Sequence, residues 1–330
     1  MILRSRTRFC IDELRPGPIL SDTMNRKLKF LIGIVGFLAL LYGAGAWYFA
    51  GVLVAFQPKT LEEDRRGRRI KGLAQFGLEK AQGVELNVSG LKLRGLYLPA
   101  ERGSKCGVVF THGHRATRFG SVQYTALFKK RGCALLIYET RRHGKSQGDF
   151  ATFGYHEKKD LHEILKWFSK KTGLPQGKIG LFGVSMGAAI SLQAAAQSPE
   201  IAFVAVDSPF SSLRRIVGEQ GRKQYGSALS VLLPGAFFFG GLRSGADLDD
   251  VSPLEYAKRI RVPVFILHSL TDTYTLPEHS RRIFAAVPHE RKVLKLTKAG
   301  AAHSRDIVKN LPVYKQAVDD FLNKHAPGFR

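Results

Sequence analysis

The chain has 330 residues, 44% of them hydrophobic, which suffices for one large folded domain with an appended segment and excludes a disordered protein. Its 51 lysines and arginines outnumber its 27 aspartates and glutamates, giving a formal net charge of +24. Such an excess favours an anionic partner, either nucleic acid or an acidic lipid surface. Because the sequence holds no nucleic-acid-binding motif, we do not expect nucleic acid to be that partner.

The first predicted element is an apolar, uncharged run over residues 30–56 that follows a basic N-terminal segment, residues 1–29. As a helix this run would measure about 40 Å, enough to cross a bilayer with some tilt. The apolar region of a cleaved signal peptide is shorter. We therefore predict a single uncleaved transmembrane anchor over 30–56, preceded by an N-terminus of cytoplasmic type.

The positive-inside rule does not by itself give the orientation of this anchor, because lysines and arginines lie on both of its flanks. A short N-terminus ahead of an anchor usually stays in the cytoplasm, so we expect the C-terminal body on the non-cytoplasmic side. Met24 lies directly before the basic residues that precede the apolar run. We therefore consider a translation start at Met24 as an alternative to one at Met1. Residues 57–82 are predicted to form a charged linker.

The three cysteines, Cys10, Cys106 and Cys133, form neither a disulfide framework nor a metal-ligand spacing. Cys106 and Cys133 stand at the starts of two apolar segments. We expect both to be buried thiols.

From residue 83 onward the pattern predicts alternating strands and helices. Residues 84–88 and 91–98 alternate apolar and polar side chains around Ser89-Gly90, which indicates a hairpin. Short apolar runs typical of a buried parallel sheet follow at 107–110, 134–138, 179–182, 202–206, 264–267 and 292–296. Helical stretches, the clearest at 161–168 and the last at 304–323, separate them. We predict an α/β domain over 83–330 whose mostly parallel sheet is covered by helices on both faces.

Between Ser212 and Asp250 this alternation breaks. Basic residues come first and an apolar, phenylalanine-rich stretch follows. We predict a small lid-like insertion over the site, residues 213–250. An ordinary amphipathic helix pair packed on the sheet fits the same pattern.

A Gly-x-Ser-x-Gly motif, Gly183 to Gly187, joins the predicted strand at 179–182 to a helix of small residues. A serine on such a strand-to-helix turn is held in a strained conformation that exposes its hydroxyl, and only glycines allow the two elements to pass so closely. We predict that Ser185 is a nucleophile and that Gly183 and Gly187 are the glycines of its turn.

A serine nucleophile needs an imidazole base, which a carboxylate holds in one tautomer. His303 follows the last predicted strand, and Asp272 follows the strand before it. The order Ser185, Asp272, His303 is the one expected of this topology. Asp207, after an earlier strand, is the rival acid.

The second group that such a site needs is a pair of donors for the developing oxyanion. One should be the amide of Met186, after the nucleophile, and the other the amide of His114, in the loop after the first buried strand. His112 and His114 lack a third partner with metal-ligand spacing. We expect no metal and no cofactor.

These motifs resemble the α/β-hydrolase superfamily over residues 83–325, and within it the membrane-anchored branch similar to BEM46-like and serine-aminopeptidase-like proteins. The resemblance rests on His112-Gly113, Arg141 to Ser146, Gly183 to Gly187, Asp272 and His303. It implies hydrolysis of an ester, thioester or amide without a cofactor, and it implies no particular substrate. It also implies that Arg141 to Ser146 form a turn that packs under the site. The family usually has Asp-x-Arg-Gly here, where this chain has Glu139-Thr140-Arg141-Arg142.

The sequence thus predicts a membrane-anchored serine hydrolase that cleaves carboxylic esters, with a lipid or acyl-thioester substrate near an anionic membrane surface. A serine peptidase or amidase of the same fold is the first alternative. A catalytically silent membrane-bound scaffold is the second.

Overall fold

The computed structural model describes residues 19–102, 104–128, 131–298 and 300–329. The chain divides into two compact units, Met1–Gly45 and Ala46–Arg330. Residues 1–18 of the predicted basic N-terminus, with Cys10 and Met1, lie outside the described residues. The larger unit contains the whole sheet and every predicted site residue.

Among the described residues, eight strands form one sheet in the order β1-β2-β4-β3-β5-β6-β7-β8. Their bounds are β1 Gln82–Val88, β2 Leu91–Leu98, β3 Gly107–Thr111, β4 Ala134–Tyr138, β5 Ile179–Val184, β6 Phe203–Asp207, β7 Val264–Ser269 and β8 Lys292–Thr297. β1 pairs antiparallel with β2, and β2 with β4, whereas all other neighbours are parallel. The predicted strands are confirmed to within two residues at each end.

Each face of the sheet carries its own apolar core, because successive side chains of a strand point to opposite faces. On β5, Leu181 packs in one core with residues of α3 (Glu157–Thr172), α4 (Met186–Ala195) and α8 (Pro277–Ala286). The next residue, Phe182, packs in the other core with residues of the 3-10 helix η3 (Val122–Leu127) and α9 (Asp306–His325). The structure therefore has the α/β-hydrolase fold, with helices on both faces.

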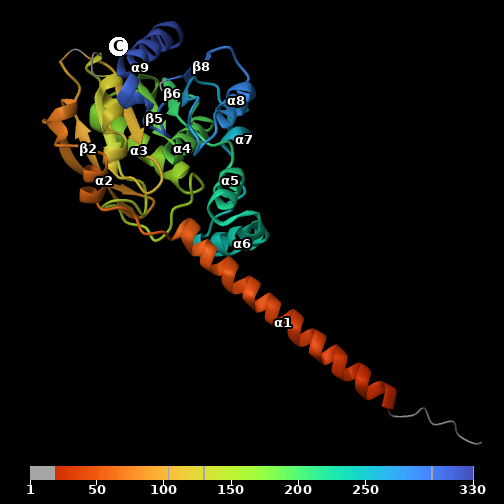
Figure 1. Ribbon diagram of the computed structural model, residues 1–330. Helices are drawn as coiled ribbons and strands as arrows, with labels where there is room; N and C mark the ends of the chain where they lie inside the picture. The colour runs from red at the N-terminus through yellow and green to blue at the C-terminus, as the bar shows by residue number, and fades with distance from the viewer. Residues whose placement is uncertain (1–18, 103, 129–130, 299, 330) are drawn as a thin grey trace, which may run out of the picture. The chain divides into compact units, whose positions relative to one another are not determined.

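The predicted insertion lies between β6 and β7. It consists of α5 (Leu213–Tyr225), the 3-10 helix η6 (Ser227–Leu232) and α6 (Leu233–Ser244), and the short helix α7 (Pro253–Ala257) follows. The Lys158 ammonium of α3 lies 2.7 Å from the Asp250 carboxylate, which ties the end of the insertion to the main body. Figure 1 shows α5 and α6 beside the last turns of α1.

The predicted anchor forms the helix α1 (Ile19–Val54), which ends two residues before the predicted boundary. Within the described residues, one helical segment, Met24–Val54, is long and apolar enough to cross a bilayer. Its last turns nevertheless belong to the larger compact unit, where Ala46, Ala50 and Val54 are fully buried. An apolar run looks the same in sequence whether it faces lipid or a protein core, so the sequence could not reveal this change of surroundings.

Residues 57–82, predicted as a linker, form the helix α2 (Leu61–Gly67) and the 3-10 turn η1 (Leu73–Phe76). Thr60 and Glu63 cap α2 reciprocally. The buried Asp64 carboxylate accepts hydrogen bonds from the amide and the hydroxyl of Thr117, at 2.8 and 2.9 Å. This segment is therefore attached to the loop that follows β3.

The expectation of two buried thiols is wrong, because Cys106 and Cys133 form a disulfide with a Cα–Cα distance of 4.7 Å. Gly107 pairs with Ala134 at the start of β3 and β4, so the residues just before them stand side by side. Their Cα separation lies in the range that a disulfide can bridge.

Candidate active site

Ser185 lies on the tight turn between β5 and α4. Its φ of 55° and ψ of −114° are unusual for a residue with a side chain. A Cβ atom on Gly183 would lie 2.2 Å from the Gly187 carbonyl oxygen, and one on Gly187 would lie 2.1 Å from the Thr111 carbonyl oxygen. Neither position has room for a side chain.

The structure brings His303 and Asp272 to this serine. The His303 Nε2 atom lies 2.8 Å from Ser185 Oγ, and its Nδ1 atom lies 2.6 Å from Asp272 Oδ2. Because an ionised carboxylate only accepts hydrogen bonds, Nδ1 carries the proton and Nε2 is free to accept one from the serine hydroxyl. The geometry is that of a nucleophile, a general base and an orienting acid.

The Asp272 carboxylate is well supplied with donors. Its Oδ1 atom accepts hydrogen bonds from the amides of Tyr274 and Thr275, at 2.9 and 3.0 Å. Burial alone would raise the pKa of this carboxyl, but the hydrogen bonds from His268 and His303 hold the pKa well below its ordinary value. Asp272 is therefore ionised at neutral pH.

The rival acid, Asp207, is bound elsewhere. Its carboxylate accepts hydrogen bonds from the hydroxyls of Tyr124, at 2.7 Å, and Ser208, at 2.8 Å. Burial raises the pKa of the Asp207 carboxyl. Of the two carboxylates that the sequence offered, the structure places Asp272 against the imidazole.

His268, which the sequence analysis did not single out, supports Asp272 from behind. It is fully buried in β7, with Nε2 at 2.8 Å from the Thr275 carbonyl oxygen and 3.3 Å from Asp272 Oδ2. Its Nδ1 atom accepts the Ser280 hydroxyl at 2.6 Å. The available signal was a histidine at the end of an apolar strand, four residues before the predicted acid.

The two predicted oxyanion donors lie in the segments that flank Ser185. Met186 is the first residue of α4, so its amide belongs to the first turn, whose amides have no carbonyl partner within the helix. His114 follows Gly113, where a Cβ atom would lie 3.3 Å from the Ser185 Cβ. The amide of Arg115 donates to His143 Nε2 at 3.2 Å, which fixes this loop from the predicted turn under the site.

The two histidines considered as metal ligands have other surroundings. His112 Nε2 accepts the amide of Thr140 at 3.1 Å, and its Nδ1 atom donates to the Gly113 carbonyl oxygen at 2.8 Å. The His114 ring lies between Phe56 and Phe153, with centroid distances of 4.3 and 5.2 Å. Burial lowers the His114 pKa to about 3, so the ring is neutral. Over the described part of the chain, no group of three or more acidic, histidine or cysteine side chains could hold a metal ion.

The turn that departs from the family pattern has a distinct role. Arg142, where the family has glycine, takes a left-handed conformation with a φ of 63°. Its guanidinium donates to the carbonyl oxygens of Ala55, at 2.5 Å, and Phe56, at 2.9 Å, and also to that of Asp149. A strained arginine thus holds the chain at the C-terminal end of α1.

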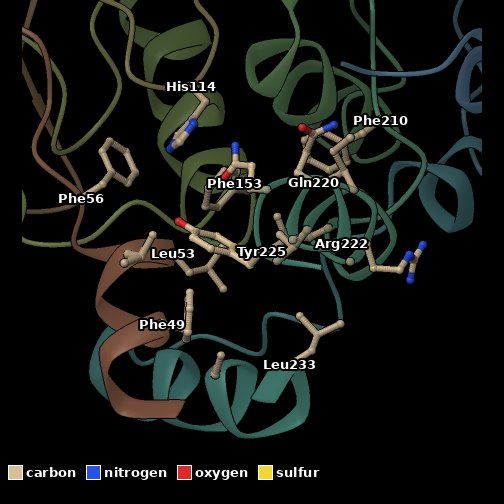
Figure 2. Close-up of a pocket in the computed structure, with 18 of the residues that line it drawn as sticks. Phe49, Leu53, Phe56, His114, Phe153, Phe210, Gln220, Arg222, Tyr225 and Leu233 are labelled. Carbon is tan, nitrogen blue, oxygen red and sulfur yellow. The ribbon is translucent and has the colours of Figure 1, made fainter. Parts of the chain in front are cut away.

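A cavity of about 570 Å³ opens beside Ser185 (Figure 2). Its walls come from the last turns of α1, from the loops after β3, β4, β6 and β7, and from α5, η6 and α6. Apolar side chains dominate them, among them Phe49, Leu53, Phe153, Ile216 and Leu233. Arg115 and Arg222 are the charged residues among the described lining residues.

Comparisons with known proteins agree with this fold. Residues 89–232 match the X-Pro dipeptidyl-peptidase family (S15 family). An uncharacterized protein of Bacillus subtilis, YqkD, is 29% identical over 301 residues, covering 89% of this chain and 97% of that protein. The alpha/beta hydrolase domain-containing protein WAV2 of Arabidopsis thaliana is 24% identical over 322 residues, covering 88% and 95%.

Among solved structures, the Pyrococcus furiosus esterase Pf2001 superposes with a TM-score of 0.61 at 25% sequence identity. The match covers 77% of this chain and 94% of the esterase. The fold and these matches support a hydrolase of the α/β-hydrolase fold.

Proposed function

We propose that this hydrolase cleaves carboxylic esters through an acyl-enzyme formed on Ser185. The observation that carries the proposal is the continuous hydrogen-bonded chain from Ser185 Oγ through His303 to Asp272, with distances of 2.8 and 2.6 Å. Three side chains from separate loops at one edge of the sheet meet there with the geometry that this chemistry requires.

In the proposed reaction Ser185 Oγ attacks the ester carbonyl carbon and passes its proton to His303 Nε2. The resulting imidazolium, stabilised by the Asp272 carboxylate, gives this proton to the leaving alkoxide as the carbon–oxygen bond breaks. Water then attacks the acyl-enzyme and gives a proton to His303 Nε2. The bond between the carbonyl carbon and Ser185 Oγ breaks, Oγ takes this proton back, and the carboxylic acid is released. The amides of His114 and Met186 would stabilise the oxyanion in both steps.

The lining of the cavity favours an ester over an unblocked peptide. The matched S15 family takes its name from a dipeptidyl-peptidase, and an enzyme that recognises a free N-terminus needs a partner for the ammonium group. The described residues that line the cavity include no carboxylate. The apolar walls suit a hydrocarbon group instead. Peptide-bond cleavage remains the alternative that this family match favours.

The direct test is labelling of the full chain with a fluorophosphonate probe, together with turnover of p-nitrophenyl esters and of an X-Pro peptide amide. Ser185→Ala should abolish labelling and ester turnover while the thermal transition stays in place. A folded wild-type protein that is neither labelled nor active would refute the nucleophile assignment and support a silent scaffold. Faster turnover of the amide than of the esters would replace the esterase by the peptidase.

We also propose that α1 anchors the protein in a membrane, with the larger unit on the non-cytoplasmic side. The basic residues before the apolar run and its length support an anchor. The Cys106–Cys133 disulfide supports this orientation, because disulfides persist in oxidising compartments.

A further inference from the structure

We infer that the last turns of α1 form one wall of the acyl-binding site, and that the substrate is an ester with a long hydrocarbon acyl chain taken from the membrane surface. This inference rests on the proposed function, because it names the substrate class of the same site. It assigns the end of a membrane helix to substrate recognition as well as to anchoring.

The first observation is that the end of α1 is a fixed part of the larger unit. Ala50 and Val54 are fully buried, and the Val54 carbonyl oxygen accepts the amide of Ala151 at 2.9 Å. Arg142 holds the next two carbonyl groups, those of Ala55 and Phe56. The helix end is therefore attached to the body of the larger unit, which also carries Ser185.

The second observation is that α1 presents apolar side chains to the cavity. Phe49, Val52 and Leu53 line it from the helix, and Figure 2 shows Phe49 and Leu53 beside Tyr225 of α5. The Phe49 and Tyr225 rings lie edge to face, with centroids 5.3 Å apart. Leu233 of α6 lines the cavity from the insertion, so α1 and the insertion together enclose the apolar space.

The third observation concerns what this space can hold. A volume of about 570 Å³ lies in the range of ligand pockets for small molecules. An ester carbonyl placed at Ser185 leaves the apolar remainder of the cavity to one of its two substituents. A hydrocarbon acyl chain fits this lining, because each of its methylenes can be removed from water without leaving a polar group unpaired.

The fourth observation sets the level of the membrane. Phe30 to Tyr48 are 19 residues, about 28 Å of helix, close to the thickness of a bilayer's hydrocarbon core. Trp47 and Tyr48, 51% and 66% exposed, stand where interfacial aromatic residues are expected. The Arg243 guanidinium lies 4.7 Å from the centre of the Trp47 ring. The cavity-lining residue Phe49 is the next residue along the helix, so the cavity begins at the membrane surface.

The insertion reaches the same level. Phe239 of α6 contacts Trp47 edge to face, with centroids 5.7 Å apart. Phe238 and Leu242, one helical turn apart on α6, are 62% and 66% exposed. An apolar helix face beside the interfacial aromatics of a membrane helix fits a lipid surface. A bilayer in contact with α6 would supply acylated substrates directly to the cavity.

The test is a p-nitrophenyl ester series of two to sixteen acyl carbons, measured on the full chain in detergent. For the wild type, kcat/KM should rise with chain length by up to about fourfold per methylene until the cavity is filled. Leu53→Ala should move the optimum to longer chains and Leu53→Trp to shorter ones. The same two substitutions at Leu38, 58% exposed on the same helix within the candidate span, provide the matched control and should keep the wild-type optimum.

If the wild type is labelled by the fluorophosphonate and cleaves the acetate ester but shows no gain with chain length, the inference is overturned and the proposed function stands. The inference is also overturned if the Leu53→Ala variant keeps the optimum acyl-chain length of the wild type. This result is sufficient even if the Leu53→Trp variant does not fold. An unlabelled, inactive wild type refutes the proposed function itself.

The membrane route has its own test, on the full chain reconstituted in phosphatidylcholine vesicles. The double variant Phe238→Asp, Leu242→Asp should lower the ratio of turnover of a bilayer-embedded long-chain ester to that of a dissolved short-chain ester several-fold. An unchanged ratio would show that substrate does not arrive through contact of α6 with lipid.

Discussion

Replacing Arg142 tests whether this arginine holds the end of α1 in place. The guanidinium donates to the Ala55 and Phe56 carbonyl oxygens, and a hydrogen bond from a charged donor contributes about 1.5–3 kcal/mol. Because Arg142 is partly exposed, we take the low end of this range, about 1.5 kcal/mol per bond, or about 3 kcal/mol for the two bonds. The bond to the Asp149 carbonyl oxygen is exposed and adds little. Its left-handed conformation costs about 1 kcal/mol, which glycine would relieve and alanine would not.

Arg142→Gly should therefore lower the free energy of unfolding by about 2 kcal/mol, and Arg142→Ala by about 3 kcal/mol. For a unit of this size these losses correspond to decreases in Tm of about 4 and 6 °C. Unfolding of the full chain in detergent can be followed by the fluorescence of Trp47, which lies on the affected helix, in a Trp167→Phe background. The loosened helix end should also weaken the preference for long acyl chains.

Arg69 offers the matched control, because it is an exposed arginine with a φ of 56°. Arg69→Gly relieves the same strain without removing the hold on α1, so it should raise stability by about 1 kcal/mol. If Arg142→Gly were as stable as Arg69→Gly, the hydrogen bonds to the end of α1 would contribute nothing, and the reasoning would be refuted.

Three further predictions concern the acid, its protonation and the disulfide. Asp272→Asn should lower kcat by about 10⁴-fold and Asp207→Asn by far less, so the reverse order would exchange their roles. Because the Asp272 pKa is depressed in the folded state, the stability it contributes is present above pH 4 and is lost as the pH falls through the folded-state pKa. A plot of Tm against pH should accordingly be flatter below pH 5 for Asp272→Asn, and parallel curves for variant and wild type would contradict this. When intact cells are treated with a thiol-blocking reagent, Cys106 and Cys133 should react with the reagent only after their disulfide has been reduced. Labelling of both cysteines without reduction would argue against the proposed orientation.

The strands and the serine turn could be predicted because their signals are local. Apolar runs of four to six residues mark strands buried on both faces, and the Gly-x-Ser-x-Gly motif marks a single strand-to-helix turn. Gly183 is required by a contact within that turn, whereas Gly187 is required by its close approach to the Thr111 carbonyl group at the end of β3. The choice of acid depended on the order of strands in space. The Asp272 loop follows β7, which pairs with β8, and His303 follows β8, so their loops are neighbours. Asp207 is the last residue of β6, which lies one strand farther from β8.

The disulfide and the end of α1 could not be predicted for a related reason. Cys106 and Cys133 are 27 residues apart, and the register of β3 against β4 brings them together. Likewise, the apolar residues of α1 form one uninterrupted run in which nothing local marks the passage from the exposed to the buried part of the helix. That passage lies near Ala46, the first fully buried alanine of the helix.

Arg142, which departs from the family pattern, is connected to the burial of the end of α1, because its guanidinium binds the carbonyl groups there. A glycine at this left-handed position would avoid strain, yet it would leave the Ala55 and Phe56 carbonyl groups without the donor that holds them. With arginine at this position, the left-handed conformation is strained, but the guanidinium holds the end of the helix. The held helix end positions Phe49 and Leu53 in the cavity wall. A truncated protein that begins near residue 57 would lose this wall while keeping Ser185, Asp272 and His303. Such a protein should, if it folds, react with the fluorophosphonate probe without distinguishing long acyl chains from short ones, whereas one beginning before Ala46 should retain the selectivity.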